Sequence, residues 1–242
     1  MCARYASVRD DVDLVEEFEA VDATDGAWPE PDYNVAPTKP ARIVVNRPLR
    51  DADGRPADHP TRQLRVASFG LVPSWSKDRR TQGRMFNARA ESIATANAFR
   101  RPYALRRCLV PVDGWYEWQV TDGPTKQPLY MTSADGRSLA LAGLYEFWGE
   151  RGQTVTTCTI LTVDSTGPLA EVHERMPLVL APAAWTRWLD PAERDPADLL
   201  APDGAPSQLE IRPVSTKVNK VDNNGPELLA RAEPQPSEQR LF

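Results

Sequence analysis

Short apolar runs bounded by proline, glycine and aspartate dominate this chain, and stretches with helical periodicity are fewer. Runs rich in Val, Ile, Thr and aromatic residues predict strands at 42–46, 64–72, 108–112, 115–120, 128–132, 138–147 and 154–163. Apolar residues at helical spacing predict helices at 10–20, 88–100 and 182–190. The polar stretches 48–61 and 194–208 are expected to be loops. The pattern therefore predicts a β-rich α+β domain with peripheral helices.

Length and composition support one domain without secretion or membrane signals. The chain has 242 residues, and its 23 prolines against 13 glycines predict many stiff connections. No apolar run approaches the roughly 18 residues of a membrane span, and the polar N-terminus lacks a signal-peptide core. We therefore expect a cytoplasmic protein. Its domain would span 2–231, and the polar tail 232–242 would be disordered.

Cysteine and histidine are too sparse to indicate a disulfide framework or a metal centre. The three cysteines are scattered, and neither of the two histidines stands at ligand spacing from a cysteine or from the other histidine. We therefore expect no metal and no cofactor.

Charge is distributed unevenly along the chain. The net charge is −5, yet residues 62–107 hold eleven basic residues, ten of them arginine, against two acidic ones. This segment alone carries +9 and leaves −14 for the rest. One interpretation is a solvated basic face balanced by the acidic remainder. The other is a groove for a phosphate backbone, since the local field governs such binding more than net charge does.

The second residue offers an uncommon chemistry. A small residue at position 2 is the usual signal for removal of the initiator methionine, so we expect the mature chain to begin with Cys2. An N-terminal cysteine carries an α-amine that titrates near about 7.7–8.0 and a thiol near about 8.5. Together these groups suit an aldehyde, because the amine forms a Schiff base and the thiol then closes a five-membered thiazolidine ring. The alternative is a stray cysteine at a frayed terminus.

Two further residues could transfer protons. Glu117 lies among tryptophans and a tyrosine in DGWYEWQV, and a carboxylate beside bulky aromatics tends to have a raised pKa. His173 precedes an apolar stretch in EVHERMPLVL. The plainer alternatives are an edge-strand glutamate and a buried histidine whose hydrogen bonds are satisfied.

Three more residues could hold a ligand. Asn87 and Arg89, in MFNARAES, stand where a loop is expected to enter a helix, and they could orient an oxyanion, a hemiacetal or a phosphate. Trp75, in VPSWSKDRR, is a tryptophan in a basic loop. That combination suits stacking on a base or wedging into a duplex, although packing in the core is an alternative.

Nine short segments follow one another over most of the chain: MCAR (1–4), YNVAPT (33–38), FGLVPSW (69–75), FNARAES (86–92), LVPVDGWYEW (109–118), KQPLY (126–130), AGLYEFW (142–148), TILTVDS (159–165) and HERMPLVL (173–180). Together and in this order, they resemble the SOS-response-associated peptidase family, also called abasic-site processing proteins. The resemblance implies a single α+β domain with a β-barrel-like, mostly antiparallel core and a basic channel for single-stranded DNA.

The resemblance also implies roles for individual residues. Cys2 would attack the ring-opened aldehyde of an abasic site and form a covalent thiazolidine crosslink. The family's motif asparagine corresponds to Asn87, which would position the sugar and the nucleophile. Its glutamate and histidine correspond to Glu117 and His173, which would serve as acid–base groups in crosslink formation and reversal.

Four other positions would contact the DNA or hold the chain terminus that lies in the active site. Arg4, Asn34 and Arg89 match positions that hold phosphates or that terminus, and Trp75 matches an aromatic residue beside the lesion. The expected partner is therefore single-stranded DNA with abasic sites, and we expect the protein to be a monomer that associates with the nucleoid when it binds DNA.

Two departures from the family pattern stand out. The family usually has MCGR at the N-terminus, whereas position 3 is Ala3 here, so a methyl group lies near the nucleophile. Asp222 stands where a basic residue is common, which argues against a DNA contact at that position.

Two other functions stay open at this level. In a thiol peptidase, Cys2 would attack an amide with His173 as base and Asn87 as oxyanion donor, chiefly to process its own N-terminus. In a non-covalent reader of DNA lesions, Cys2 would be incidental.

Overall fold

The larger of two sheets closes on itself into a ring. The computed structural model describes residues 2–24, 26–51, 53–121, 126–150, 152–201 and 209–233. The strand order of the larger sheet is β12-β11-β10-β7-β4-β5-β2, and β6 pairs with β11 off this path. Its strands are β2 (Val21–Asp22), β4 (Pro40–Arg50), β5 (Pro56–Phe69), β6 (Asn87–Arg89), β7 (Arg107–Val112), β10 (Leu139–Trp148), β11 (Val155–Asp164) and β12 (Arg175–Pro177). Parallel pairing of β11 with β5 closes the ring.

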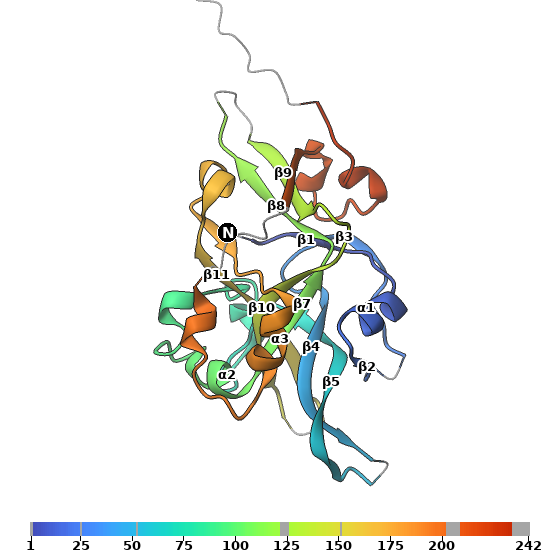
Figure 1. The fold of residues 1–242 in the computed structure, drawn as a ribbon, viewed down its shortest axis with the longest axis vertical. Helices are drawn as coiled ribbons and strands as arrows, with labels where there is room; N and C mark the ends of the chain where they lie inside the picture. Colours follow the sequence, from blue (N-terminus) through green and yellow to red (C-terminus); the bar gives the residue numbers. More distant parts are fainter. Residues whose placement is uncertain are drawn as a thin grey trace, which may run out of the picture.

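A smaller antiparallel sheet lies beyond one end of this ring, at the top of Figure 1. Its strand order is β13-β9-β8-β1-β3. The strands are β1 (Tyr5–Ser7), β3 (Asp32–Val35), β8 (Gly114–Gln119), β9 (Gln127–Ser133) and β13 (Leu209–Pro213). Among the described residues β1 is the first strand and β13 the last, so the beginning and the end of the described fold belong to the same sheet.

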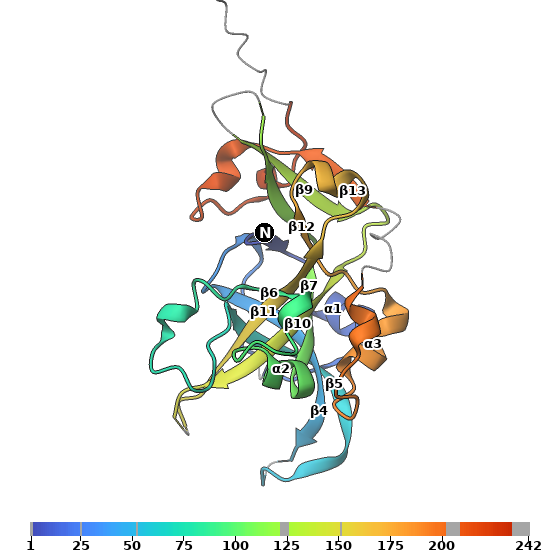
Figure 2. The same ribbon diagram turned by 90° about the vertical axis from the view of Figure 1, so that its left-hand side faces the viewer.

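The α-helices of the described residues are short and peripheral. They are α1 (Asp11–Glu17), α2 (Arg100–Leu105) and α3 (Pro182–Leu189). Asp10 caps α1 by accepting a hydrogen bond from the Val12 amide at 2.9 Å. Proline begins α3, where its missing N–H costs nothing. Figure 2 shows α2 and α3 outside the ring of strands, and none of the helices described is long and apolar enough to cross a membrane.

Apolar strand residues fill the ring. β7 is buried at all six positions, which explains why the sequence after Arg107, residues 108–112, is continuously apolar rather than alternating. A separate cluster lies on the small sheet, where Tyr116 and Tyr130 pack against Val214, Val218 and Leu228 of the C-terminal segment. The predicted α+β class with a mostly antiparallel core is therefore confirmed, and the expected barrel is a ring-like sheet.

Two sequence-based expectations were wrong. Residues 88–100 do not form a helix: 87–89 is strand β6, a 3-10 turn follows at Ala90–Ser92, and α2 begins only at Arg100. Pairing of β6 with β11 outweighs the local helical preference. The expected loop 48–61 extends β4 and β5 into a long hairpin, whose backbone pairing tolerates polar, exposed side chains. Of the tail 232–242, residues 234–242 lie outside the described residues.

Candidate active site

Strand β1 places Cys2 beside Glu117. Tyr5 pairs with Trp115 in antiparallel register, and the Tyr116 amide donates a hydrogen bond to the Arg4 carbonyl at 3.0 Å. Continuing this register brings the first residues of the chain opposite Glu117 of β8. The negative charge of Glu117 accordingly acts on the Cys2 thiol. A conventional strand pairing thus brings the Cys2 thiol and a carboxyl group together.

The Cys2 thiol is fully buried, which changes its protonation. Burial raises the pKa of this thiol far above its ordinary value, and the charge of Glu117 raises it further. The pKa of a free cysteine, about 8.5, therefore overstates the fraction of the Cys2 thiol that is ionised at neutral pH. A raised pKa favours the protonated thiol, whose proton must leave when the sulfur forms a bond.

Glu117 is a buried carboxyl group close to the thiol. Burial raises the pKa of this carboxyl group, whereas the electrostatic influence of His173 opposes that rise. The carboxyl group is therefore coupled electrostatically to both the Cys2 thiol and the His173 imidazole. A carboxyl group with a raised pKa suits general acid–base work near neutral pH.

Backbone groups hold the imidazole of His173. Its Nδ1 accepts a hydrogen bond from the Arg175 amide at 2.9 Å and lies 3.2 Å from the Arg175 carbonyl oxygen. Because Nδ1 accepts the Arg175 N–H through its lone pair, the proton of the neutral ring lies on Nε2. The backbone of Arg175 therefore fixes the orientation of the imidazole.

Asn87 presents an unsatisfied acceptor. It begins β6 opposite Ile160 of β11, and its Nδ2 donates a long hydrogen bond of 3.4 Å to the Ile160 carbonyl. Its Oδ1 is buried and has no hydrogen-bond partner among the described residues. A buried acceptor without a partner is uncommon and is typical of a site that a ligand completes.

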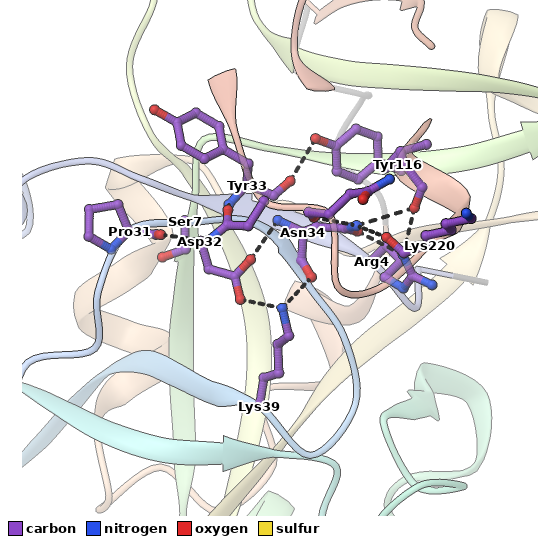
Figure 3. A network of polar contacts seen from close by, with 12 residues as sticks. Arg4, Ser7, Pro31, Asp32, Tyr33, Asn34, Lys39, Tyr116 and Lys220 are labelled. Carbon is purple, nitrogen blue, oxygen red and sulfur yellow. Dashed lines mark hydrogen bonds and ion pairs between the residues drawn. The ribbon is translucent and has the colours of Figure 1, made fainter. Parts of the chain in front are cut away.

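Arg4 and Asn34 tie the start of the chain to its end (Figure 3). Asn34 is completely buried, and its Nδ2 lies within hydrogen-bonding distance of the carbonyls of Val218, Lys220 and Asn223 at 2.9–3.2 Å. Arg4 donates to Asn34 Oδ1 at 2.7 Å and to the Val218 carbonyl at 2.9 Å. The resemblance implied that Arg4 and Asn34 hold either DNA phosphates or the chain terminus at the active site. The hydrogen bonds described here match the second role, because Asn34 has no exposed surface that could contact DNA.

Neighbouring bonds reinforce this connection. Lys39 donates to the Asp32 carboxylate at 2.7 Å and to the Asn34 carbonyl at 3.1 Å. The Tyr116 hydroxyl donates to the Tyr33 carbonyl at 2.8 Å. Strands β1, β3 and β8 are thereby fixed to one another within a few residues of Cys2.

The basic segment 62–107 separates into structural and exposed residues. Arg107 is buried and donates to four backbone carbonyls, and Arg106 pairs with Glu146 at 2.7 Å. Five exposed side chains make no hydrogen bond or ion pair with the described part of the chain: Lys77, Arg84, Arg89, Arg100 and Arg101. These five are the residues that could meet an anionic ligand.

Trp75 lies beside part of that exposed group. Its indole is 64% exposed, which excludes the alternative that it packs in the core. Together with Asn97, Arg100 and Arg101 it lines an open hollow of about 470 Å³. An exposed indole among arginines is typical of a surface on which a base stacks.

Arg175 is a site residue that the sequence reasoning did not single out. Its guanidinium binds Glu91 at 2.8 and 3.0 Å, and it also contacts Asp164 and the Thr162 carbonyl. It thereby joins the segment that carries Asn87 to the segment that carries His173. The signal was available, because Glu91 and Arg175 both stand inside the quoted motifs FNARAES and HERMPLVL.

The structure thus brings Cys2, Glu117 and His173 into electrostatic contact, and β11 connects them to Asn87. Arg4 and Asn34 lie behind this group, whereas Arg89 and Trp75 are exposed. Within the described ranges, no three His, Cys, Asp or Glu residues are arranged to hold a metal ion.

Comparisons with known proteins agree on one family. A sequence model described as SOS response associated peptidase (SRAP) matches residues 1–221. "Abasic site processing protein YoqW" of Bacillus subtilis is 34% identical over 95% of this chain and 99% of its own. "Abasic site processing protein HMCES" of Rattus norvegicus is 31% identical over 85% of this chain and 68% of its own.

Solved structures show the same fold at lower identity. A protein from Bacteroides thetaiotaomicron has a TM-score of 0.79 at 22% identity, covering 96% of this chain and 100% of its own. A protein from Bordetella bronchiseptica has a TM-score of 0.72 at 23% identity, covering 88% and 100%. With the family match over nearly its whole length, this chain belongs to the SOS response associated peptidase family.

Proposed function

We propose that this protein captures abasic sites in single-stranded DNA as a covalent thiazolidine through Cys2. The observation that carries the proposal is the grouping of a terminal cysteine with a buried carboxyl group and an imidazole. The chain's membership in a family whose curated relatives are named abasic site processing proteins supports this substrate. The crosslink would shield the lesion during the DNA-damage response until it is reversed.

The chemistry requires removal of Met1, which frees the α-amine of Cys2. That amine adds to the C1′ aldehyde of the ring-opened deoxyribose, and loss of one water gives the protonated Schiff base. The Cys2 sulfur then bonds to C1′, while its proton leaves and the C=N electron pair returns to nitrogen. Glu117 would receive and return protons in these steps, and His173 would assist in ring opening.

The remaining residues would bind the strand. Asn87 Oδ1, which lacks a partner, would accept a hydrogen bond from a sugar hydroxyl or from the amine. Arg89 would contact a phosphate, and Trp75 would stack on a base beside the lesion. In this scheme Arg4 and Asn34 position the terminal strand and do not touch DNA.

The raised pKa of the Cys2 thiol separates this proposal from a thiol peptidase that processes its own N-terminus. A thiol peptidase needs a thiolate to attack the amide, and burial opposes thiolate formation here. In aldehyde capture the amine attacks first, and the thiol adds later to an already electrophilic imine. Burial of the thiol therefore favours capture over peptidase action.

Denaturing electrophoresis with a single-stranded oligonucleotide carrying one abasic site tests the proposal. The parent protein should give a heat-stable shifted band, Cys2→Ala should give none, and Cys108→Ala, which removes another buried thiol, should retain it. Mass spectrometry should show loss of Met1 and, in the complex, loss of one water. A protein that lacks Met1 yet gives no band would refute covalent capture, and binding unchanged in Cys2→Ala would indicate a non-covalent reader.

A variant that lacks both proton-transfer groups tests the peptidase alternative. If Glu117→Gln combined with His173→Ala still loses Met1, as intact mass would show, the protein does not process its own terminus. Retention of Met1 only in this variant would support the peptidase.

A further inference from the structure

Two hydrogen-bond donors are buried on the face of the small sheet that carries Glu117. Tyr5 of β1 and Trp115 of β8 are direct partners in the antiparallel register. Their side chains therefore share one face, and their Cβ atoms lie about 4.5–5.5 Å apart. Trp115 precedes Glu117 by two positions on β8, and alternate residues of a strand point to the same side. The two aromatic side chains are thus neighbours of the carboxyl group that is coupled to the Cys2 thiol.

Neither donor has an acceptor among the described residues. Tyr5 is 0% exposed, and its hydroxyl makes no hydrogen bond there. Its ring meets Phe69 edge-on, with 5.3 Å between the centroids, so packing fixes its position. Trp115 is 1% exposed, and its indole Nε1–H, which can only donate, is also without a partner in the described part of the chain. Two adjacent buried donors without acceptors are uncommon and point to a group that they meet during function.

The Tyr5 hydroxyl lies near the reacting sulfur and keeps its own proton. Burial raises the pKa of Tyr5 well above its ordinary value, and the negative charges of ionised Cys158 and Cys2 raise it further. Asp32 acts in the same direction, and Arg42 opposes it. The hydroxyl is therefore a donor at any ordinary pH, and the Cys2 sulfur is close enough to act on it electrostatically.

The proposed capture places negative charge on this sulfur in both directions. In ring closure the S–C1′ bond forms while the Cys2 thiol proton passes to the Glu117 carboxylate and the C=N electron pair returns to nitrogen. In reversal the nitrogen lone pair re-forms the C=N bond, the S–C1′ bond breaks, and its electron pair stays on sulfur, which takes the proton back from Glu117. A buried sulfur anion is costly without hydrogen bonds, so donors beside it would lower the barrier of both steps.

We infer that the Tyr5 hydroxyl and the Trp115 indole N–H form a donor pair that stabilises the Cys2 sulfur while it exchanges its proton for the bond to C1′. This inference deepens the proposed capture of abasic sites and rests on it. A thiol or a thioether sulfur is a weak acceptor, whereas a partly anionic sulfur accepts strongly because the hydrogen bond is charge-assisted. The pair should therefore accelerate closure and reversal alike and leave the final yield unchanged.

Reversible thiazolidine formation with acetaldehyde tests the pair without DNA. Intact-mass spectrometry of the protein that lacks Met1 follows formation of the ring and its hydrolysis after dilution. Tyr5→Phe and Trp115→Phe each remove one donor and keep an aromatic ring. Each should slow both directions about tenfold, the loss expected for a hydrogen bond to a charged group, with an unchanged final yield. Tyr103→Phe is the matched control, because the Tyr103 hydroxyl on α2 donates to Asp195 at 2.7 Å, and it should keep the parent rates.

Stability separates this role from a structural one. Because the Tyr5 hydroxyl has no partner among the described residues, Tyr5→Phe should unfold in urea at the parent midpoint or above it. Parent rates in either Tyr5→Phe or Trp115→Phe would overturn the donor pair. Slower formation with a reduced final yield in Tyr5→Phe would overturn it too, because that result indicates a displaced terminus.

An abasic-site oligonucleotide provides the second arm of the experiment. If the parent protein forms the thiazolidine with acetaldehyde but no crosslink with this DNA, the proposed function fails, and the acetaldehyde rates of Tyr5→Phe still decide the role of the donors. If the parent and Tyr5→Phe crosslink the DNA at the same rate, the donor pair is refuted and the proposed function stands.

Discussion

Replacing Asn34 by alanine should weaken the whole protein through the connection between the two ends of the chain. The amide has two hydrogens, which are shared among three carbonyls of residues 218–223, and its oxygen accepts from Arg4. Two neutral hydrogen bonds contribute about 1 kcal/mol each, and one bond to a charged donor about 1.5–3 kcal/mol. Asn34→Ala should therefore lower the free energy of unfolding by ~3.5–5 kcal/mol.

Urea unfolding measures that loss, and amide hydrogen exchange locates it. Exchange should accelerate first in residues 216–224, which dock against Asn34, and less in β7 at the centre of the ring. Asn46→Ala is the matched control, since the Asn46 side chain on β4 makes no hydrogen bond with the described residues, and it should change stability by less than about 0.5 kcal/mol. Asn34→Asp keeps the acceptor for Arg4 but removes both donors, so it should destabilise the protein too. A loss below about 1 kcal/mol for Asn34→Ala, or a tolerated Asn34→Asp, would refute the reasoning.

Three other predictions concern pH, packing and salt. Burial raises the pKa of Glu117 above its usual 4.5. Ionisation of this carboxyl group therefore destabilises the native state progressively as the pH rises from 4.5 to the raised pKa. In urea unfolding, Glu117→Gln should be more stable than the parent at about pH 8 and equal to it at about pH 4; equality at both would contradict this. Gly143→Ala should cost about 1–3 kcal/mol in the same assay, because its methyl group would lie 2.9 Å from Cys108 Sγ and 3.0 Å from the Thr159 carbonyl oxygen. If about four phosphates are contacted, the affinity for single-stranded DNA should fall with salt at a log–log slope near −3; a flat response would exclude a basic groove.

The interior strands were predictable from the sequence because buried strands are rich in apolar and β-branched residues. The expected strand at 154–163 matches β11 (Val155–Asp164), and the expected helix at 182–190 matches α3 (Pro182–Leu189). Short strands were not recognisable: β6 and β12 have three residues each and exist through pairing with β11. No local pattern of three residues can reveal the partner of β6, which lies some seventy positions away along the chain.

The candidate site was likewise predictable only in part, in its residues but not in their surroundings. Cys2, Glu117 and His173 were named from chemistry and motif, and the structure brings them together. The environment of the thiol was not predictable, because complete burial depends on the segments that cover it. Asn34 likewise looked like a ligand contact until its amide was found in hydrogen bonds with the distant segment 218–223.

The joining of residues 4 and 34 to residues 218–223 has a consequence for how the chain is made. A ribosome adds roughly 5–20 residues per second, so about 10–40 s separate the synthesis of Arg4 from that of Val218. During that interval β1 cannot be fastened to the C-terminal segment, because the carbonyls that Arg4 and Asn34 bind have not yet been made. The strand that is translated first is therefore among the last to be secured, and enzymes that act on nascent chains can reach the N-terminus before the fold closes over it.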